Sequence, residues 1–208
     1  ANRNGIAYID GNELKKFNNG ILLQDFGTGD VDILNNELNP LSFITPFGST
    51  IGNAGIMVFN TVPRDIDLNI NDNDLKKLRY GIWLTNVEGP NQAVFNNKVM
   101  FNQFGPGWPS AGTTHYGIRL QGCDNTVVDD NEIKKSGPAP TSSNPADLLR
   151  GISVENSTDC DIQRNYMFKM GTGIWGEDVL FGSRIRCNEM KRNFWGINLE
   201  NVSIGNHF

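Results

Sequence analysis

Three side chains that can exchange a proton or carry a charge stand close together near the middle of the chain: His115, Tyr116 and Arg119. A carboxylate, Glu155, follows further along. A lyase or epimerase acting on uronic-acid polymers needs a base at the sugar C5, a proton donor, and a cation or metal that neutralises the carboxylate. These four residues could fill the catalytic roles. In the alternative interpretation, Arg119 and Glu155 form an exposed ion pair worth ~0 to 1 kcal/mol, and His115 is an ordinary loop residue.

Whether these residues meet depends on a repeat that runs through the chain. An asparagine followed two positions later by an apolar residue occurs in eight copies. In every copy but the last, an apolar residue also stands three positions before the asparagine. Repeats of this period indicate a solenoid. The asparagines are Asn12, Asn36, Asn73, Asn97, Asn131, Asn165, Asn188 and Asn206.

A second mark, Gly-Ile, recurs between the asparagines. It begins at Gly20, Gly55, Gly81, Gly117, Gly151, Gly173 and Gly196. The spacing from an asparagine to the next glycine is either eight residues or nineteen to twenty. The unit is therefore a coil of about two dozen residues, and all long insertions enter at one corner. These insertions are Pro40 to Ala54, Gln103 to Tyr116 and Gly137 to Arg150.

Segments between the marks alternate apolar and polar residues, as in Asp65 to Ile70 and Gly151 to Glu155. This is the period of a half-buried strand, and no stretch has a helical period. The pattern predicts an all-β solenoid of about seven to eight coils, in which each coil adds one strand to each of several parallel sheets. We expect each asparagine to adopt the left-handed conformation and to bond its neighbours in a ladder. We expect the glycines at another tight corner.

The pattern Gly-Ile-x-apolar, followed by apolar-x-x-Asn-x-apolar, resembles the right-handed parallel β-helix repeat of the pectate lyase-like superfamily. Residues 151–154 and 162–167 carry it most clearly. The resemblance covers essentially the whole chain and implies a right-handed, single-stranded parallel β-helix and export from the cell. It specifies the fold rather than an activity, because this fold carries lyases, hydrolases, epimerases and adhesins.

Composition narrows the class of protein. The 208 residues predict one domain, 1–208, which we interpret as a segment of a longer, secreted or cell-surface protein. A net charge of -5 argues against a nucleic-acid partner, and no apolar run is long enough to span a membrane. The three cysteines occupy different positions in the coil, so we expect free thiols. We predict no metal and no cofactor, and contact at the ends with another β-helix segment or chain.

The strand that starts at each Gly-Ile follows the corner with the insertions; we call these strands the Gly-Ile sheet. Alternation places two sets of side chains on its outer face: Leu22, Met57, Trp83, Arg119, Ser153, Trp175 and Asn198, and, two positions further along, Gln24, Phe59, Thr85, Gln121, Glu155, Glu177 and Glu200. Aromatic rings, amides and carboxylates on one extended face suit a polysaccharide. The alternative is a small apolar cluster beneath the loops. The expected ligand-binding residues are Met57, Trp83, Arg119, Gln121, Trp175 and Glu177, with Trp108 from an insertion. The coil of Asn73 has no insertion, which predicts a cleft there.

Other acidic residues are interpreted as structural. Asp65, Asp67, Asp72 and Asp74 lack the glycine turn and distal glutamate of a calcium loop. Asp129 and Asp130 resemble the paired aspartates of β-helix polygalacturonases, but they adjoin the asparagine corner, away from the Gly-Ile sheet. Arg164 stands at the matching position one coil later and is the expected partner of Asp130.

Three hypotheses follow. The preferred one is an exported or cell-surface module that binds polysaccharide on the Gly-Ile sheet beside the insertions. The second is a lyase or epimerase that uses His115, Tyr116, Arg119 and Glu155. The third is a structural or adhesive rod without ligand chemistry.

Overall fold

The computed structural model describes residues 5–15, 17, 19–40, 54–101, 114–140 and 148–203. Within these ranges the chain consists of strands, turns and bends. Every pair of neighbouring strands is parallel, as in β11 with β14 and β13 with β16. In the described part of the chain, no helix is long and apolar enough to cross a membrane.

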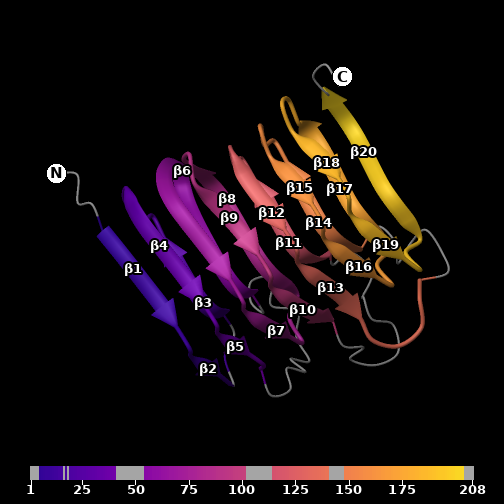
Figure 1. Ribbon diagram of the computed structural model, residues 1–208, viewed down its shortest axis with the longest axis horizontal. Coiled ribbons are helices and arrows are strands. Elements are labelled where there is room, and N and C mark those ends of the chain that lie inside the picture. The colour runs from indigo at the N-terminus through magenta and orange to yellow at the C-terminus, as the bar shows by residue number, and fades with distance from the viewer. Residues whose placement is uncertain are drawn as a thin grey trace.

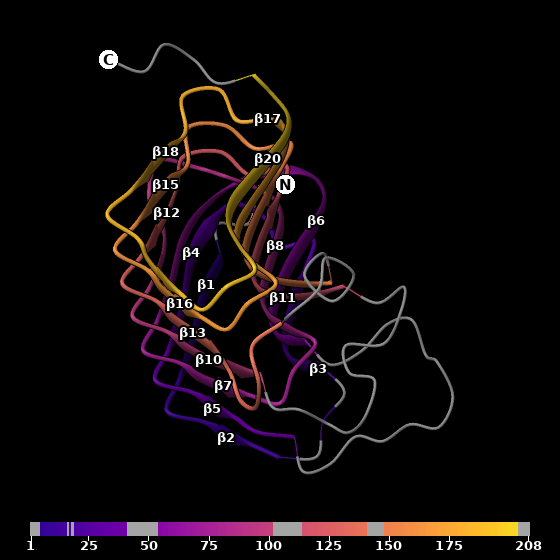
Figure 2. The same ribbon diagram turned by 90° about the vertical axis from the view of Figure 1, so that its right-hand side faces the viewer.

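Three parallel sheets surround the core (Figure 2), and they stack along one axis with the two termini at opposite ends (Figure 1). β6 bends through one corner and belongs to two sheets. Sheet A contains β1 (Gly5–Asp10), β4 (Gly29–Leu34), the second part of β6 (Ala54–Asn71), β9 (Gln92–Phe95), β12 (Thr126–Asp129), β15 (Asp161–Gln163) and β18 (Arg184–Arg186).

Sheet B follows the asparagines. It contains β2 (Glu13–Leu14), β5 (Glu37–Leu38), β7 (Asp74–Lys76), β10 (Lys98–Phe101), β13 (Glu132–Lys135), β16 (Tyr166–Phe168) and β19 (Glu189–Lys191). The Gly-Ile sheet contains β3 (Asn19–Gln24), the first part of β6, β8 (Tyr80–Glu88), β11 (His115–Gln121), β14 (Leu149–Glu155), β17 (Thr172–Val179) and β20 (Trp195–Ser203). Each sheet therefore has one strand from each coil, and the predicted parallel β-helix is confirmed.

The asparagine ladder is also confirmed. From Asn12 to Asn165, the backbone N–H and side-chain Nδ2 of each ladder residue donate to Oδ1 of the asparagine one coil later. For Asn131 these distances to Asn165 are 3.0 and 2.9 Å. Nδ2 also donates to the carbonyl of Val94 in the preceding coil at 2.8 Å. The same pattern links Asn12 through Asn188, so the amide satisfies backbone groups that the corner leaves unpaired.

The conformation predicted for the ladder was wrong by one position. The left-handed residue is the one before each asparagine, with φ between 51° and 66°. These residues are Gly11, Asn35, Asp72, Asn96, Asp130, Arg164 and Cys187. Because the preceding residue makes the turn, the ladder asparagine can point its side chain inward, where Asn97 and Asn165 are fully buried.

The role predicted for the repeated glycines was also wrong. They lie inside the strands of the Gly-Ile sheet, not at a tight corner. A Cβ on Gly117 would come within 2.5 Å of the Gly151 carbonyl oxygen and 2.6 Å of an Ile133 methyl from sheet B. Glycine is therefore required by close packing of the strand against the next coil and the opposite sheet.

The core is a column of aliphatic side chains, one layer per coil. In sheet A the inward column runs through Ile33, Ile70, Val94, Val128 and Ile162, which have at most 1% of their surface exposed. All three thiols are free, as predicted. Cys123 and Cys160 lie in the core, and burial raises their pKa values to about 11 and about 12. Cys187 is exposed.

Candidate functional site on the Gly-Ile sheet

The strand register fixes which side chains are neighbours on the outer face of the Gly-Ile sheet. The first predicted set forms a column in the order Leu22, Met57, Trp83, Arg119, Ser153, Trp175 and Asn198. The second set forms a parallel column in the order Gln24, Phe59, Thr85, Gln121, Glu155, Glu177 and Glu200. Both columns agree with the alternation predicted from sequence.

A third column contributes to the same face and was missed. It contains the residue before each glycine: Asn19, Ala54, Tyr80, Tyr116, Arg150, Thr172 and Trp195. Tyr116 was predicted as a site residue, but Tyr80 and Arg150 were not. The available signal was the position itself, since these residues hold one fixed place in the repeat.

Glu155 is the centre of a hydrogen-bonded cluster. Arg119 Nε donates to both carboxylate oxygens at 3.1 Å, and Arg119 Nη2 contacts Oε2. The hydroxyl of Ser153 donates to Oε1 at 2.8 Å, and Arg150 Nη1 lies 3.5 Å from the same oxygen. The Glu155 side chain is 9% exposed and that of Arg119 is 16% exposed. The predicted alternative of an exposed pair was therefore wrong, because the pair is largely removed from water.

The pKa of Arg119 reflects this environment. Burial by itself lowers the pKa of the guanidinium, but the hydrogen bonds and charge of Glu155 outweigh that effect and raise it above its ordinary value. The Arg119 guanidinium thus stays charged, and its ion pair with Glu155 uses its hydrogen-bond donors.

Arg150 connects this cluster to the next coil. Its guanidinium carbon lies 3.6 Å from the centre of the Trp175 ring and 5.6 Å from that of Tyr116. Trp175 Nε1 donates to Glu177 Oε2 at 3.3 Å. Trp175 is consequently only 5% exposed although it points outward from the sheet. A cation stacked on the ring covers the surface that a sugar would otherwise contact.

The aromatic residues of β8 and β11 form a second, smaller apolar cluster. Tyr80 stacks on Tyr116 with ring centres 5.5 Å apart, and Trp83 lies 4.8 Å from Tyr80. Met57 packs against the same group. Arg119 lies 4.8 Å from the rings of both Trp83 and Tyr116. Met57 and Trp83 thus pack in a small apolar cluster and remain half-exposed, while the insertions that the alternative interpretation places above them lie outside the described residues.

Two polar atoms at this cluster have no hydrogen-bond partner among the residues that the structure describes. Trp83 Nε1 and Thr85 Oγ1 are both buried and both belong to β8. The residue Thr85 is 7% exposed and lies in the second outward column, between Phe59 and Gln121. Buried polar groups without partners are uncommon in folded proteins, and a water or a ligand can complete their hydrogen bonding. Arg150 Nε and Thr172 Oγ1 on the same sheet also have no hydrogen-bond partner among the described residues.

β8 is also the strand for which the sequence predicted a cleft. The connection from β7 to β8 consists of residues 77–79 only, so no insertion enters here. Residues 41–53, 102–113 and 141–147 lie outside the described residues, and with them Trp108 and most of the three insertions. The cleft therefore remains a prediction.

His115 lies at the start of β11 and is 6% exposed. Burial, and secondarily the positive charge of Arg79, lower its pKa to about 3. The imidazole is therefore neutral at physiological pH. The structure brings Tyr116, Arg119 and Glu155 together on the outer face, whereas His115 is enclosed beside them.

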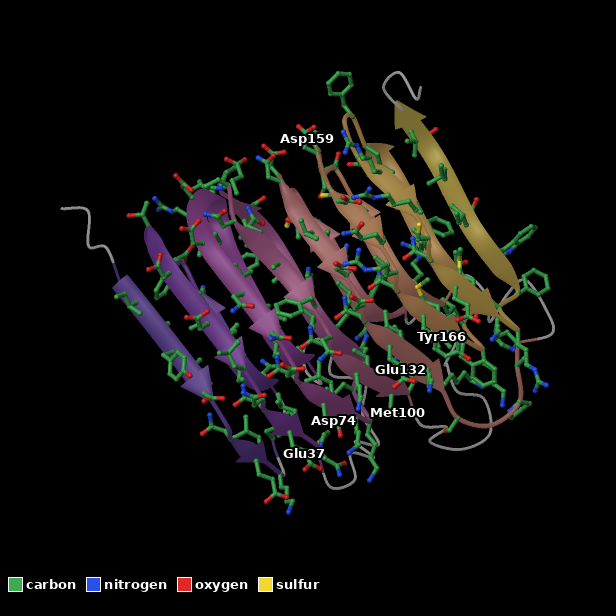
Figure 3. The ribbon with its side chains drawn as sticks, viewed as in Figure 1. Glu37, Asp74, Met100, Glu132, Asp159 and Tyr166 are labelled. Carbon is green, nitrogen blue, oxygen red and sulfur yellow. The ribbon has the colours of Figure 1, made fainter. Side chains whose placement is uncertain are left out.

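The outer face of sheet B is different in kind. Figure 3 labels Glu37, Asp74, Glu132 and Tyr166, which lie in one column of this sheet, with Lys98 of β10 between Asp74 and Glu132. Lysines two positions along the same strands pair with the carboxylates, as Lys76 does with Asp74 at 2.6 Å. These pairs are solvated, so each contributes little to stability.

The other aspartates considered from the sequence lie away from the outer face of the Gly-Ile sheet. Arg164 Nε donates to Asp130 Oδ2 at 3.2 Å, which confirms the predicted pair, and Arg164 also contacts Asp129. Asp65 and Asp67 lie in β6. They line a small surface hollow with Asp30, and the described residues contain no group of three or more His, Cys, Asp or Glu side chains arranged to hold a metal ion.

These observations define the class of protein: a parallel β-helix with an internal asparagine ladder and one outer face that carries interlocked aromatic and charged residues. The family model "Periplasmic copper-binding protein (NosD)" matches residues 2–208, and the chain belongs to this family. The family's periplasmic description agrees with the export predicted from sequence. No curated protein and no solved structure matches the chain.

The family description raises the question of copper, for which thiolate, thioether and imidazole are the usual ligands. In the described part of the chain these donors are dispersed. Cys123, Cys160 and Met167 lie in the core, His115 is enclosed at the start of β11, and the exposed Cys187 follows β18. Within the described ranges, no three or more His, Cys, Asp or Glu side chains are grouped so that they could hold a metal ion. The residues described do not fit a copper centre.

Proposed function

We propose that this exported β-helix binds a polysaccharide on the outer face of the Gly-Ile sheet, across β6, β8 and β11. The observation that carries the proposal is the pair of unpartnered polar atoms on β8, Trp83 Nε1 and Thr85 Oγ1. Sugar hydroxyls can both accept from the indole N–H and exchange hydrogen bonds with a threonine hydroxyl.

The surroundings of these two atoms support a sugar. Met57 and Phe59 on β6 are half-exposed apolar neighbours, and Gln121 on β11 supplies an amide. Apolar surface next to planar polar groups suits a pyranose ring, whose C–H faces contact hydrocarbon while its hydroxyls bond at the rim. Successive strands about 4.8 Å apart offer such positions repeatedly along the solenoid axis.

The lyase or epimerase hypothesis has less support. The guanidinium required to neutralise a uronic-acid carboxylate is that of Arg119, and Glu155 already occupies it. The base would be His115, whose ring is enclosed. Both groups would have to change partners before they met a substrate.

Affinity electrophoresis in gels that contain neutral or acidic polysaccharides tests the proposal, with absorbance of unsaturated products recorded alongside. Trp83→Ala removes an indole N–H at the proposed site. Trp195→Ala is the matched control, since Trp195 is 47% exposed on the same sheet but lies on β20. We expect retention by at least one polymer, lost in Trp83→Ala and kept in Trp195→Ala, without product formation.

Retention that both variants keep would place binding elsewhere, and wild-type protein retained by no polymer would overturn the proposal. A titration with Cu(I) and Cu(II) in parallel addresses the family description. A melting temperature that rises with added copper and stops rising at one copper ion per chain would favour copper over polysaccharide as the ligand.

A further inference from the structure

The outer face of sheet B carries two parallel columns of side chains that differ in charge. From β5 to β19, the first column contains Glu37, Asp74, Lys98, Glu132, Tyr166 and Glu189. The second column stands two positions further along the strands from β7 to β19, and it contains Lys76, Met100, Lys134, Phe168 and Lys191. Carboxylates thus dominate the first column, and every charged residue of the second is a lysine.

Within one molecule, lysines of the second column pair with the carboxylates beside them on the same strand. Lys76 Nζ lies 2.6 Å from Asp74 Oδ2, and Lys134 contacts Glu132. These side chains remain accessible, since 38% of the Asp74 side chain and 36% of the Glu132 side chain are exposed. An ammonium group has three donors and a carboxylate has two acceptor oxygens. Each member of such a pair can therefore bind a second charged group that approaches from outside the sheet.

Apolar side chains lie between the charged pairs on this face. Tyr166 and Phe168 stand on β16 with ring centres 6.2 Å apart and ring planes 12° apart. Met100 stands on β10, and Figure 3 labels it together with Tyr166. All three side chains are half-buried. Aromatic residues and methionine are enriched in the centres of protein–protein interfaces, so this face combines apolar contact surface with flanking charges.

The two columns make this face complementary to itself. When two copies face each other across a twofold axis parallel to the solenoid axis, the first column of one copy lies opposite the second column of the other. Glu132 then meets the second copy's Lys134, and Tyr166 meets the second copy's Phe168. A twofold axis at right angles to the solenoid would instead set carboxylates against carboxylates. A polymer of a single charge would also meet like charges in one column, so a second copy fits this face better.

We propose that the outer face of sheet B binds the same face of a second copy of this chain, with the two solenoids parallel. Facing sheets pack about 10 Å apart, a distance that lysine and glutamate side chains can span together. Because the same surface is used by both copies, the interaction is isologous and closes as a dimer. The Gly-Ile sheet lies on another side of the solenoid (Figure 2), so dimerisation is independent of the polysaccharide binding proposed there.

Sedimentation velocity of the full chain over a wide range of concentrations tests this proposal. Wild-type protein should form a dimer as concentration rises. Glu132→Lys sets a cation against the second copy's Lys134, and Lys134→Glu sets a carboxylate against its Glu132. Each variant alone should therefore dimerise roughly tenfold or more weakly, equivalent to about 1.4 kcal/mol. An equimolar mixture of the two variants should recover dimerisation. Each chain in the mixture still has two like charges on β13, so the recovery can come only from the contact between chains.

Phe168→Ala provides a second route, since it removes apolar contact surface and should also weaken dimerisation. Phe95→Ala is the matched control, because Phe95 is 36% exposed on β9 of sheet A and should leave dimerisation unchanged. Circular dichroism and melting temperature show whether each variant remains folded. Wild-type protein that stays monomeric at every concentration would overturn the proposal. So would a dimer that the mixture does not restore, or one that Glu132→Lys strengthens, since carboxylates would then face each other.

Discussion

The asparagine corner and the outer face of the Gly-Ile sheet are built from the same coils, but they differ in what is repeated. At the corner, every coil presents the same residue with the same hydrogen bonds, from Asn12 to Asn188. On the outer face, each coil presents a different side chain, such as Trp83, Arg119 or Trp175. The identical asparagines stabilise the stack. The outward side chains of the Gly-Ile sheet differ from coil to coil, so one part of this face differs chemically from the rest.

The largest expected effect lies at the corner. Asn131→Ala removes the Nδ2 group that donates to Asn165 Oδ1 and to the Val94 carbonyl. It also removes the Oδ1 that accepts from Asn97 in the buried ladder. Several buried polar groups lose their partners, so we expect a loss on the order of 4 kcal/mol in unfolding free energy, measured by urea denaturation. Asn198→Ala is the control, because Asn198 is only half-buried on the outer face of the Gly-Ile sheet, where its amide donates to Glu200 at 3.5 Å. Equal losses in the two variants would contradict a structural ladder.

A smaller loss is expected when the charged cluster of the outer face is broken. Glu155→Gln leaves the largely buried Arg119 without its counter-charge, which costs roughly 3 kcal/mol for a buried pair. Asp130→Asn weakens the solvated Asp130–Arg164 pair and should cost ~0 to 1 kcal/mol. Chemical denaturation of the two variants measures the difference. Equal losses of unfolding free energy in the two variants would mean that the Arg119–Glu155 pair is as well solvated as the Asp130–Arg164 pair.

The glycines test close packing between coils. Gly117→Ala would place a methyl group 2.5 Å from the Gly151 oxygen, and the resulting displacement should cost about 1 to 3 kcal/mol. At Gly196 the nearest atom to an added Cβ is Met190 Sδ at 4.0 Å, so Gly196→Ala should be nearly neutral. Thermal melts of the pair check this expectation, and a neutral Gly117→Ala would show that the coils have room to separate.

His115 makes stability depend on pH. Its pKa is about 3 in the folded protein, against about 6.5 when unfolded, so the unfolded chain binds the proton first as pH falls. The stabilising contribution is present above pH 6.5 and is lost as pH falls toward 3, at about 1.4 kcal/mol for each pH unit. His115→Gln should flatten this slope in melts between about pH 6.5 and 4.5. An unchanged slope would mean that other groups cause it.

Much of the fold could be predicted because the repeat restricts it strongly. Once Asn131 and Gly117 mark two fixed places in a coil, the strands, the ladder and both outward columns follow by counting. The errors concern local geometry. Sequence does not distinguish the left-handed residue from its neighbour Asn131, and a glycine that fits a turn looks the same as one that packs against Ile133.

The site was predicted less completely for a different physical reason. Alternation placed Trp83, Arg119 and Glu155 on one face, but it was counted only after the glycine, so Tyr80 and Arg150 before it were missed. Burial depends on neighbours in other coils. The stacking of Arg150 on Trp175, which covers that ring, joins residues of β14 and β17 and leaves no local signal in either strand.

Thr85→Val tests the central claim most directly, because it removes one unpartnered hydroxyl and keeps the shape of the side chain. The Thr85 hydroxyl has no partner among the described residues, so its loss should leave the melting temperature unchanged or slightly higher. The same protein should bind the retained polysaccharide roughly tenfold more weakly, a difference of about 1.4 kcal/mol. Lower stability with unchanged binding would contradict the account and assign the hydroxyl to the fold.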